Sequence, residues 1–299
     1  MTSEIYTDVS HRHDFVLLFD VTDGNPNGDP DAGNLPRVDP ETMHGLVTDV
    51  CLKRKVRNYI DVLRGKEERY KIYVQHNSYL YDQQARAYTA LGMDKGKSDV
   101  EKARKWMCDN FFDVRMFGAV MSTKAYNCGQ VCGPVQLTFA RSIDPIIPLD
   151  IGITRVALTK PSDRKEVSTE ENEDMTPTHG TMGRKALLPY GLYRGHGFFT
   201  PHFAKGTGCT SEDLDLFWEA LRKMWDMDHS AARGLISLRG LYIFSHQNGL
   251  GNAPAHTLFD HIIVTRKEDV KAPRKFSDYT VMVKENNMPD GVTLTSLAG

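Results

Sequence analysis

Two polar stretches near the N-terminus contain the residue types most able to do chemistry. The first is a turn from Asp23 to Asn34 that is rich in Asp, Asn, Gly and Pro. The second is basic: Lys53 and Arg57 are four residues apart, so a helix projects both from one face, beside Arg54. Cations next to a flexible polar turn suit a phosphate backbone, and a solvated cationic helix surface is the alternative.

The acidic turn permits two hypotheses that involve a metal ion. Asp23, Asn25 and Asn27 follow the first half of a calcium-binding EF-hand loop, but its twelfth position is Asn34, where the pattern needs a bidentate Glu. A metal-dependent ribonuclease is the second hypothesis. Its candidate carboxylates are those of Asp20, Asp23, Asp29 and Asp31. Asp is also a common turn former, so a structural role is the simpler interpretation.

A zinc site is conceivable because Cys128 and Cys132 are separated by three residues. The histidines that could complete it are His11, His13, His196 and His202. No second pair with ligand spacing is defined, so structural thiols and surface histidines are expected instead. The chain has five cysteines, an odd number without a tight framework, which favours reduced thiols. We therefore expect no bound metal and no cofactor.

A strand and a helix must position the polar turn and the basic residues. Residues 14–22 are apolar on both faces, which is typical of a central strand. Asp39 offers an N-cap oxygen and Pro40 suits a first helical position, so a helix is expected from there to about Leu63. Its apolar stripe consists of Leu52, Val56, Tyr59, Ile60 and Leu63.

Residues 66–112 are expected to form a small helical lobe inserted into a strand-rich chain. Alternation over residues 69–75 predicts a strand with Tyr70, Ile72 and Val74 on one face. Helices are predicted over residues 83–91 and from a capping box of Ser98 and Glu101 to about Asn110. Strands follow over residues 134–140, with Val135, Leu137 and Phe139 inward, and over residues 151–158.

Residues 160–185 differ from their surroundings because Val167 is their one aliphatic residue. Such a segment cannot bury enough apolar surface to order on its own. Strand-like segments flank it at residues 153–158 and 186–193, which predicts a long protruding hairpin with a mobile tip. An ordinary surface loop is the alternative, although insertions of this length are more often functional or linkers.

The C-terminal third indicates a conventional core. Thr210 is expected to cap an amphipathic helix whose apolar positions are Leu214, Phe217, Trp218, Leu221 and Trp225. Strands are predicted within residues 230–244, 259–265 and 279–284, and the tail from Pro289 is expected to be loose. Because strands and helices mix without strict alternation, we predict an α+β sheet with helices on one face.

Composition indicates a globular protein that folds in water. Of its 299 residues, 40% are hydrophobic and 25% are charged, and no apolar run approaches the length of a membrane span. The N-terminus is polar, without a signal-peptide core, so we expect a cytoplasmic location. The net charge of −2 is unusual for a stand-alone nucleic-acid binder. Cations nevertheless gather at Lys53, Arg54, Lys55, Arg57, Arg64, Lys66, Arg69 and Lys71, and acids at Glu170, Glu171, Glu173 and Asp174.

Three motifs carry a resemblance to a known family. They are DGNPNGDPDAGNLPRVDPETMHGLVTDVCLKR at residues 23–54, DVRMFG at 113–118 and MGRKALLPYGLY at 182–193. In wording, order and spacing the chain resembles the backbone subunit of type I CRISPR Cascade complexes, in the RAMP superfamily. The turn Asn25–Asp29 is most similar to the subtype I-C branch. The resemblance extends from about residue 13 to 285.

This resemblance implies a ferredoxin-like, RRM-type palm with an inserted finger lobe and a protruding thumb hairpin. The expected division is palm at 1–65, 113–158 and 189–288, fingers at 66–112, thumb at 159–188 and a flexible tail at 289–299. It also implies a non-catalytic subunit that polymerises head-to-tail along a CRISPR RNA and presents it for pairing with a target DNA strand. The implied partners are an end-capping RAMP subunit and large and small Cascade subunits, with no membrane.

The resemblance also suggests which residues contact RNA. Backbone contacts are expected from Thr48, Lys53, Arg54 and Arg57 on the first helix, with Arg37 on the approach to it. Asn25 and Asn27 would donate hydrogen bonds from the turn, and Arg184 and Lys185 would hold phosphates at the thumb base. Met175 and Met182 are candidates for an apolar wedge that splays a base. Val50 departs from the family pattern, where a polar residue often lies.

Two other classes of function are consistent with the residues. One is the metal-dependent ribonuclease that uses the acidic turn. The other is an assembly protein that stacks on copies of itself without contacting nucleic acid, which the near-neutral net charge permits.

Overall fold

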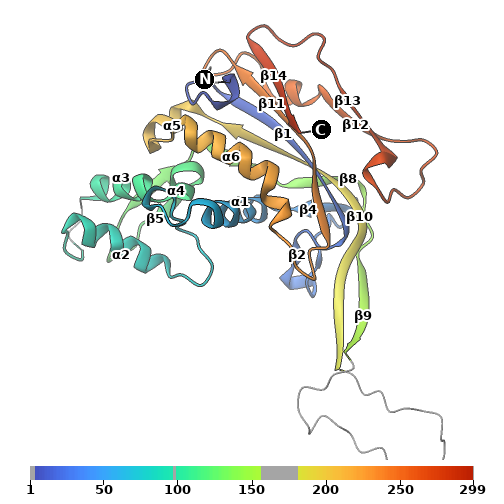
Figure 1. Cartoon of the computed structure of the whole chain (residues 1–299), viewed down its shortest axis with the longest axis horizontal. Helices are drawn as coiled ribbons and strands as arrows, with labels where there is room; N and C mark the ends of the chain where they lie inside the picture. The colour runs from blue at the N-terminus through green and yellow to red at the C-terminus, as the bar shows by residue number, and fades with distance from the viewer. Residues whose placement is uncertain (1–3, 97–98, 156–180, 299) are drawn as a thin grey trace, which may run out of the picture.

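The fold is built around one antiparallel sheet. The computed structural model describes residues 4–96, 99–155 and 181–298. The sheet has the spatial order β14-β11-β1-β10-β8-β4, and β7 and β9 also pair with β10 (Figure 1). Its strands are β1 (His13–Gly24), β4 (His44–Val47), β7 (Val135–Leu137), β8 (Ala140–Pro145), β9 (Leu149–Arg155), β10 (Thr181–Phe199), β11 (Leu235–His246) and β14 (Val292–Ala298).

Helices and three small hairpins complete the described chain. The helices are α1 (Asp49–Arg64), α2 (Leu80–Leu91), α3 (Val100–Asn110), α4 (Phe112–Phe117), α5 (Pro201–Thr207), α6 (Ser211–Lys223) and α7 (Ala255–Phe259). The hairpins pair β2 (Gly28–Asp29) with β3 (Leu35–Pro36), β5 (Gly118–Met121) with β6 (Gly129–Cys132), and β12 (Ile262–Arg266) with β13 (Tyr279–Val283). None of these helices is long and apolar enough to span a lipid bilayer.

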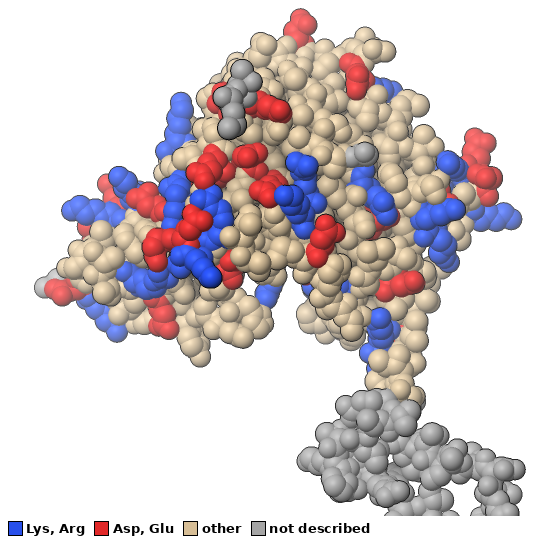
Figure 2. Space-filling view, viewed as in Figure 1, with Lys and Arg blue, Asp and Glu red and all other residues tan. Residues whose placement is uncertain are grey.

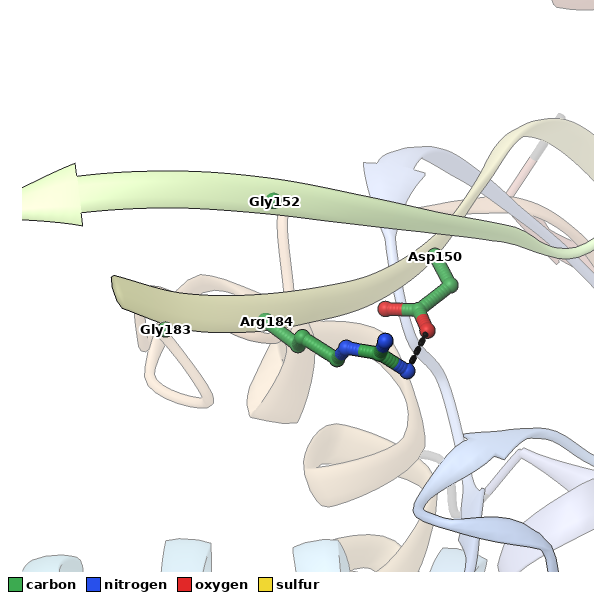
Figure 3. A pocket seen from close by; sticks show the side chains of 4 residues that line it. All are labelled: Asp150, Gly152, Gly183 and Arg184. Atoms are coloured by element: carbon green, nitrogen blue, oxygen red, sulfur yellow. Dashed lines mark hydrogen bonds and ion pairs between the residues drawn. The ribbon is translucent and has the colours of Figure 1, made fainter.

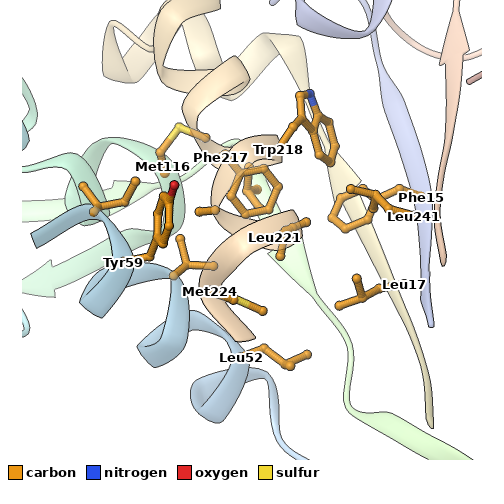
Figure 4. Close-up of a cluster of buried hydrophobic side chains, with 14 of the residues drawn as sticks. Phe15, Leu17, Leu52, Tyr59, Met116, Phe217, Trp218, Leu221, Met224 and Leu241 are labelled. Atoms are coloured by element: carbon orange, nitrogen blue, oxygen red, sulfur yellow. The ribbon is translucent and has the colours of Figure 1, made fainter. Parts of the chain in front are cut away.

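Strand β1 is buried on both faces, which confirms the predicted central strand. It pairs with β10 on one edge and with β11 on the other. Phe15 and Leu17 face α1 and α6 in the main core, where they meet Leu52 and Phe217 (Figure 4). The intervening residue, Val16, belongs to a second cluster that includes residues of α7 and β12. The sheet therefore separates two apolar layers.

The order of elements along the chain explains how the two main helices come to lie together. Strand β1 is followed by α1, β8, β10, α6 and β11, and these four strands lie side by side as β11-β1-β10-β8. Both α1 and α6 pack on the same face of the sheet, and their side chains interdigitate in the main core (Figure 4). The result is a mixed α+β fold with a central antiparallel sheet, as predicted. The short helix α7 and the β12–β13 hairpin cover the other face.

Helix α1 begins nine residues later than its sequence signals suggest. The N-cap is Thr48 rather than Asp39. The carboxylate of Asp39 instead accepts hydrogen bonds from the backbone N–H groups of Glu41 and Thr42, at 3.1 and 3.3 Å. Residues 44–47 then form β4, which pairs with β8. An Asp-Pro pair serves tight turns as well as helix starts, so the two could not be separated from residue types alone.

Helices α2 and α3 form a lobe with its own apolar core. Tyr88 of α2 and Met107 of α3 are buried in a cluster that also takes in Met121 and Cys128 of the β5–β6 region. The second helix starts after an N-cap at Asp99, whose carboxylate accepts from the Lys102 N–H at 3.2 Å, rather than after the predicted cap at Ser98.

A fully buried ion pair connects the lobe to α6. Arg115 of α4 and Asp213 of α6 are both inaccessible to solvent and contact each other twice, with Nη2–Oδ1 at 2.7 Å and Nε–Oδ2 at 3.0 Å. Arg115 also donates to the carbonyl oxygen of Cys108 in α3 at 2.7 Å. Burial alone would raise the pKa of Asp213, but the hydrogen bonds and charge of Arg115 outweigh it and lower the pKa. Asp213 is therefore ionised at neutral pH.

Three further predicted features are wrong. Residues 69–75 form no strand: Glu68–Tyr70 is a 3-10 helix, and the N–H groups of Tyr73 and Val74 donate to the carboxylate of Asp113 instead of to a neighbouring strand. Phe139 is 51% exposed rather than inward, because β7 ends at Leu137 and β8 starts at Ala140.

The C-terminal tail is the third of these features. Residues 292–298 form β14, which pairs with the outer edge of β11. An exposed strand edge offers unpaired N–H and C=O groups, and Leu294 adds apolar contact with the second cluster. The predicted cap of α6 is confirmed, because Thr210 and Asp213 form a capping box there. The segment predicted to form the hairpin tip, residues 160–180, lies outside the described residues.

We expect Arg115→Met to lower the free energy of unfolding by about 3–5 kcal/mol, because Asp213 would remain charged and buried without its partner. Chemical denaturation followed by circular dichroism measures this difference. The double variant Arg115→Met/Asp213→Asn should lose less than the sum of the two single variants. Additive losses would show that the pair is not coupled.

Candidate nucleic-acid interface

The predicted turn residues hold the start of α1 in place. The side-chain oxygen of Asn27 accepts from the backbone N–H of Thr48 at 3.0 Å and from its hydroxyl at 2.9 Å. The Thr48 hydroxyl oxygen in turn accepts from the N–H of Cys51 at 3.2 Å and caps the helix. Asn27 and Thr48 therefore act first as structural residues that fix where the basic helix begins.

Asn25 also has a structural role. It is 3% exposed, and its side-chain amide donates to the carbonyl oxygen of Asn34 at 2.7 Å. Arg233, which the sequence did not single out, donates to the carbonyl oxygens of Asn25 and Pro26 at 3.2 and 2.6 Å. No sequence pattern marks Arg233, because its partners are backbone atoms some two hundred residues away.

Two buried polar atoms of this region have no hydrogen-bond partner among the described residues. They are Oδ1 of Asn25 and Nε of Arg37. The Arg37 guanidinium otherwise contacts Asp29 at 3.4 Å, and its side chain is 31% exposed. Unpaired buried polar atoms are costly, so the hydrogen bonding of this turn is incomplete within the described residues.

Most of the cations predicted to form the basic face are already neutralised. Lys53 contacts Asp49 at 3.0 Å, and Arg57 contacts the buried Asp113 at 2.7 Å, with both cations only 13% exposed. Arg54 is different, because it is exposed and no ion pair is found for it within the described part of the chain. The cation-rich segment between Lys53 and Lys71 repeats this pattern: Lys55, Arg64, Arg69 and Lys71 have carboxylate partners, and Lys66 has none among the described residues.

Arg184 and Lys185 lie at the base of the β9–β10 hairpin, but on opposite faces. Successive side chains of a strand alternate between its two faces. Arg184 is 82% exposed and pairs with Asp150 at 2.9 Å across the hairpin. This pair lines an open pocket of about 570 Å³ together with Gly152 and Gly183 (Figure 3). An exposed pair of this kind contributes little to stability, so a phosphate can exchange with the carboxylate at low cost.

The lobe and the hairpin border a common hollow. Figure 2 shows the molecule hollowed between the lobe of α2 and α3 and the region of β2, which lies beside the base of the β9–β10 hairpin (Figure 1). The main core places α1 between these two parts, on the α6 side of the sheet (Figure 1). The candidate wedge residue Met175 lies outside the described residues. Met182 is in β10, where it pairs with Thr154, and its side chain is not described.

The structure does not gather the acids of the turn into a metal site. Asp20 is 2% exposed; it accepts from the Tyr190 hydroxyl at 2.9 Å and pairs with Arg239 at 2.9 Å. Asp29 caps a 3-10 helix through the N–H of Asp31. Over residues 4–96, 99–155 and 181–298, no group of three or more His, Cys, Asp or Glu side chains is placed to hold a metal ion.

Two of the hypothetical zinc ligands, His13 and His196, make other contacts. His13 is buried between the Ser245 hydroxyl and the carbonyl oxygen of Asp8, both at 2.9 Å, and burial lowers its pKa to about 4. His196 stacks on Phe259, and burial lowers its pKa to about 4 as well. Cys128 is buried and Cys132 is exposed.

Comparisons with known proteins identify the family of this chain and agree with its fold. A sequence model of the family described as CRISPR-associated protein Cas7 matches residues 11–284, and the chain belongs to this family. A curated relative, CRISPR-associated protein Cas7 of Haloferax volcanii, is 25% identical over 235 residues. That match covers 71% of this chain and 64% of the relative, slightly less than two thirds of its length.

One solved structure supports the fold. A chain of a CRISPR RNA-guided surveillance complex (pre-nicking) is similar with a TM-score of 0.50 and 14% identity, over 78% of both chains. A chain of another CRISPR RNA-guided surveillance complex has a TM-score of 0.45 and 15% identity, over 78% of this chain and 68% of that chain. At such identities the first likeness concerns the fold alone.

We expect Arg57→Ala to lower the free energy of unfolding by about 1–3 kcal/mol, because Asp113 would lose its charged partner while keeping two backbone hydrogen bonds. Arg54→Ala is the matched control and should stay within about 0.5 kcal/mol of the wild type. Urea denaturation measures both. Equal stability of the two variants would contradict a structural role for Arg57.

Proposed function

We propose that this chain is the repeated backbone subunit of a type I CRISPR surveillance complex of the Cascade kind, nearest to subtype I-C. It binds CRISPR RNA and polymerises head-to-tail along it in the cytoplasm. The observation that carries this proposal is the family match over residues 11–284. The Asn25–Asp29 turn, most similar to the subtype I-C branch, supports the subtype.

The proposed parts are a palm, fingers and a thumb. The spatial order β11-β1-β10-β8, with α1 and α6 on one face, supports a ferredoxin-like palm. We assign the fingers to residues 66–112 and the thumb to residues 159–188, and the separate apolar cluster of α2 and α3 supports the first assignment. Residues 289–298, expected to be a loose tail, are better assigned to the palm because β14 pairs with β11.

The subunit holds RNA through phosphates and leaves sequence recognition to base pairing between guide and target DNA. Arg54 and Arg184 are the exposed cations that we assign to phosphate binding. Lys53 and Arg57, on the same helix as Arg54, are paired with Asp49 and Asp113, and Arg37 lies in the turn before α1. The engagement of Asp20 with Tyr190 and Arg239 supports binding without bond cleavage. An end-capping RAMP subunit and large and small subunits complete the proposed complex.

RNA-templated assembly is tested by purifying the protein from cells that also express a CRISPR array. We expect a high ratio of absorbance at 260 nm to that at 280 nm, and large uniform particles by light scattering that collapse to monomers on RNase treatment. A monomer free of nucleic acid would contradict templated assembly by this chain alone. Particles that survive RNase treatment and do not respond to salt would favour the assembly protein without RNA.

We expect Arg54→Ala to weaken RNA binding without changing its sequence preference, and to reduce the slope of log affinity against log salt by about 0.7. Fluorescence anisotropy with two RNAs of unrelated sequence, at several salt concentrations, measures both quantities. Lys105→Ala on α3 is the matched control, since Lys105 is also exposed and without an ion pair within the described residues. The proposal for α1 fails if the two variants bind alike.

A further inference from the structure

The loop that joins β12 to β13 carries four exposed cations. Its exposed cations are Lys267, Lys271, Arg274 and Lys275, and none of them has a carboxylate partner among the described residues. We call residues 267–275 the basic loop. Figure 2 shows Lys and Arg side chains over this hairpin, at the right of the view. In the predicted basic segment around α1, by contrast, most cations are already paired.

The local hydrogen bonds keep these cations free. Asp278 is the carboxylate best placed to neutralise the loop, but it accepts from the backbone N–H groups of Arg274 and Lys275, at 2.8 and 3.2 Å. The acids Glu268 and Asp269 are also exposed, but they follow Lys267 at the opposite end of the loop. Positive charge therefore concentrates in the half from residue 271 to 275.

The basic loop is held on a rigid support. Asp144, at the end of β8, accepts from Arg266 at 2.8 Å and from the Tyr279 hydroxyl at 2.7 Å, so both strands of the hairpin are fastened to the sheet. Phe276 packs against the cluster of Tyr190 and Tyr279. A loop fixed at both ends loses little conformational entropy when a ligand binds.

The basic loop belongs to the layer of the sheet that faces away from α1. The β12 residue Ile262 packs with Val16 of β1 in the second cluster, whereas Leu52 of α1 packs with Leu17 in the main core. Neighbouring side chains of β1 thus point to the two layers, with the sheet between them. A strand held along α1 and a ligand at the basic loop would occupy different faces.

We propose that the basic loop binds the phosphate backbone of a second nucleic-acid strand, one that is not held at α1. Unpaired Lys and Arg side chains on a fixed exposed loop suit phosphates, which need charge and no shape-matched pocket. Protein interfaces instead bury an apolar and aromatic centre, and the apolar side chains here, Val270 and Phe276, are partly buried in the protein itself. Binding at the basic loop is independent of sequence.

The test uses the full chain, purified with the RNA it retains, and a labelled single-stranded DNA that is not complementary to that RNA. The loop variant carries Lys271→Ala, Arg274→Ala and Lys275→Ala. We expect it to bind the DNA at least about tenfold more weakly than the wild type at about 100 mM salt, with a salt slope reduced by about 2. Fluorescence anisotropy across a salt series measures both.

A control variant matches the change in net charge. It carries Lys105→Ala, Lys205→Ala and Arg222→Ala, three exposed cations without ion pairs within the described residues and away from the basic loop. We expect its affinity to stay within about twofold of the wild type. A charge-conserving variant, with Lys271→Arg, Arg274→Lys and Lys275→Arg, should also retain binding, because phosphates respond to charge.

Four outcomes would overturn the proposal. They are no binding of the DNA by the wild type, equal losses in the loop and control variants, loss of the co-purified RNA from the loop variant, and unchanged DNA binding with loss of a protein partner. Loss of the co-purified RNA would mean that the loop binds the guide strand, and loss of a protein partner would mean that the loop is a protein contact. RNA retained by the loop variant also keeps this test separate from that of the function proposed for α1.

Discussion

One buried carboxylate determines how the parts of this chain are held together. Asp213 accepts from Arg115 of α4 at 2.7 Å, from Arg69 before the lobe at 2.8 Å and from the Thr210 backbone N–H at the start of α6 at 2.9 Å. A charge in such a place is costly unless all its hydrogen bonds are made, so the arrangement tolerates only one relative position of the lobe and the sheet. That position sets the width of the hollow beside α1.

Internal ion pairs also determine which cations are available to bind a partner. A basic stretch of sequence does not by itself make a basic surface, since Arg57 and Arg69 form ion pairs with Asp113 and Asp213. Arg54 differs from its neighbours Lys53 and Arg57 because they have carboxylate partners, whereas Arg54 has none among the described residues. The near-neutral net charge of −2 therefore does not describe the surface alone, because it also counts charges that are paired inside the molecule.

Patterns with a local cause were predictable from the sequence. The central strand, the apolar stripe of α1 from Leu52 to Ile60 and the cap at Thr210 each depend on residues within a few positions of one another. Leu63, at the end of the predicted stripe, is instead 49% exposed. Features that depend on distant partners were not. Residues 69–75 alternate like a strand, but Asp113 takes their N–H groups, and β14 orders only because the edge of β11 is available to it. The candidate site divides in the same way: the sequence pointed to Asn27 and Thr48, but not to Arg233, which supports them through backbone atoms.

The position of β1 links the two surfaces. Because β1 is buried on both faces, the elements that cover the sheet lie on one face or the other. Helices α1 and α6 cover one face, and α7 with the β12–β13 hairpin covers the other. The cations of each layer therefore reach solvent on different faces, and no rotation of a side chain can bring Arg54 and Arg274 to one phosphate. If both surfaces bind nucleic acid, they bind separate segments, and the sheet between them fixes how far apart those segments run.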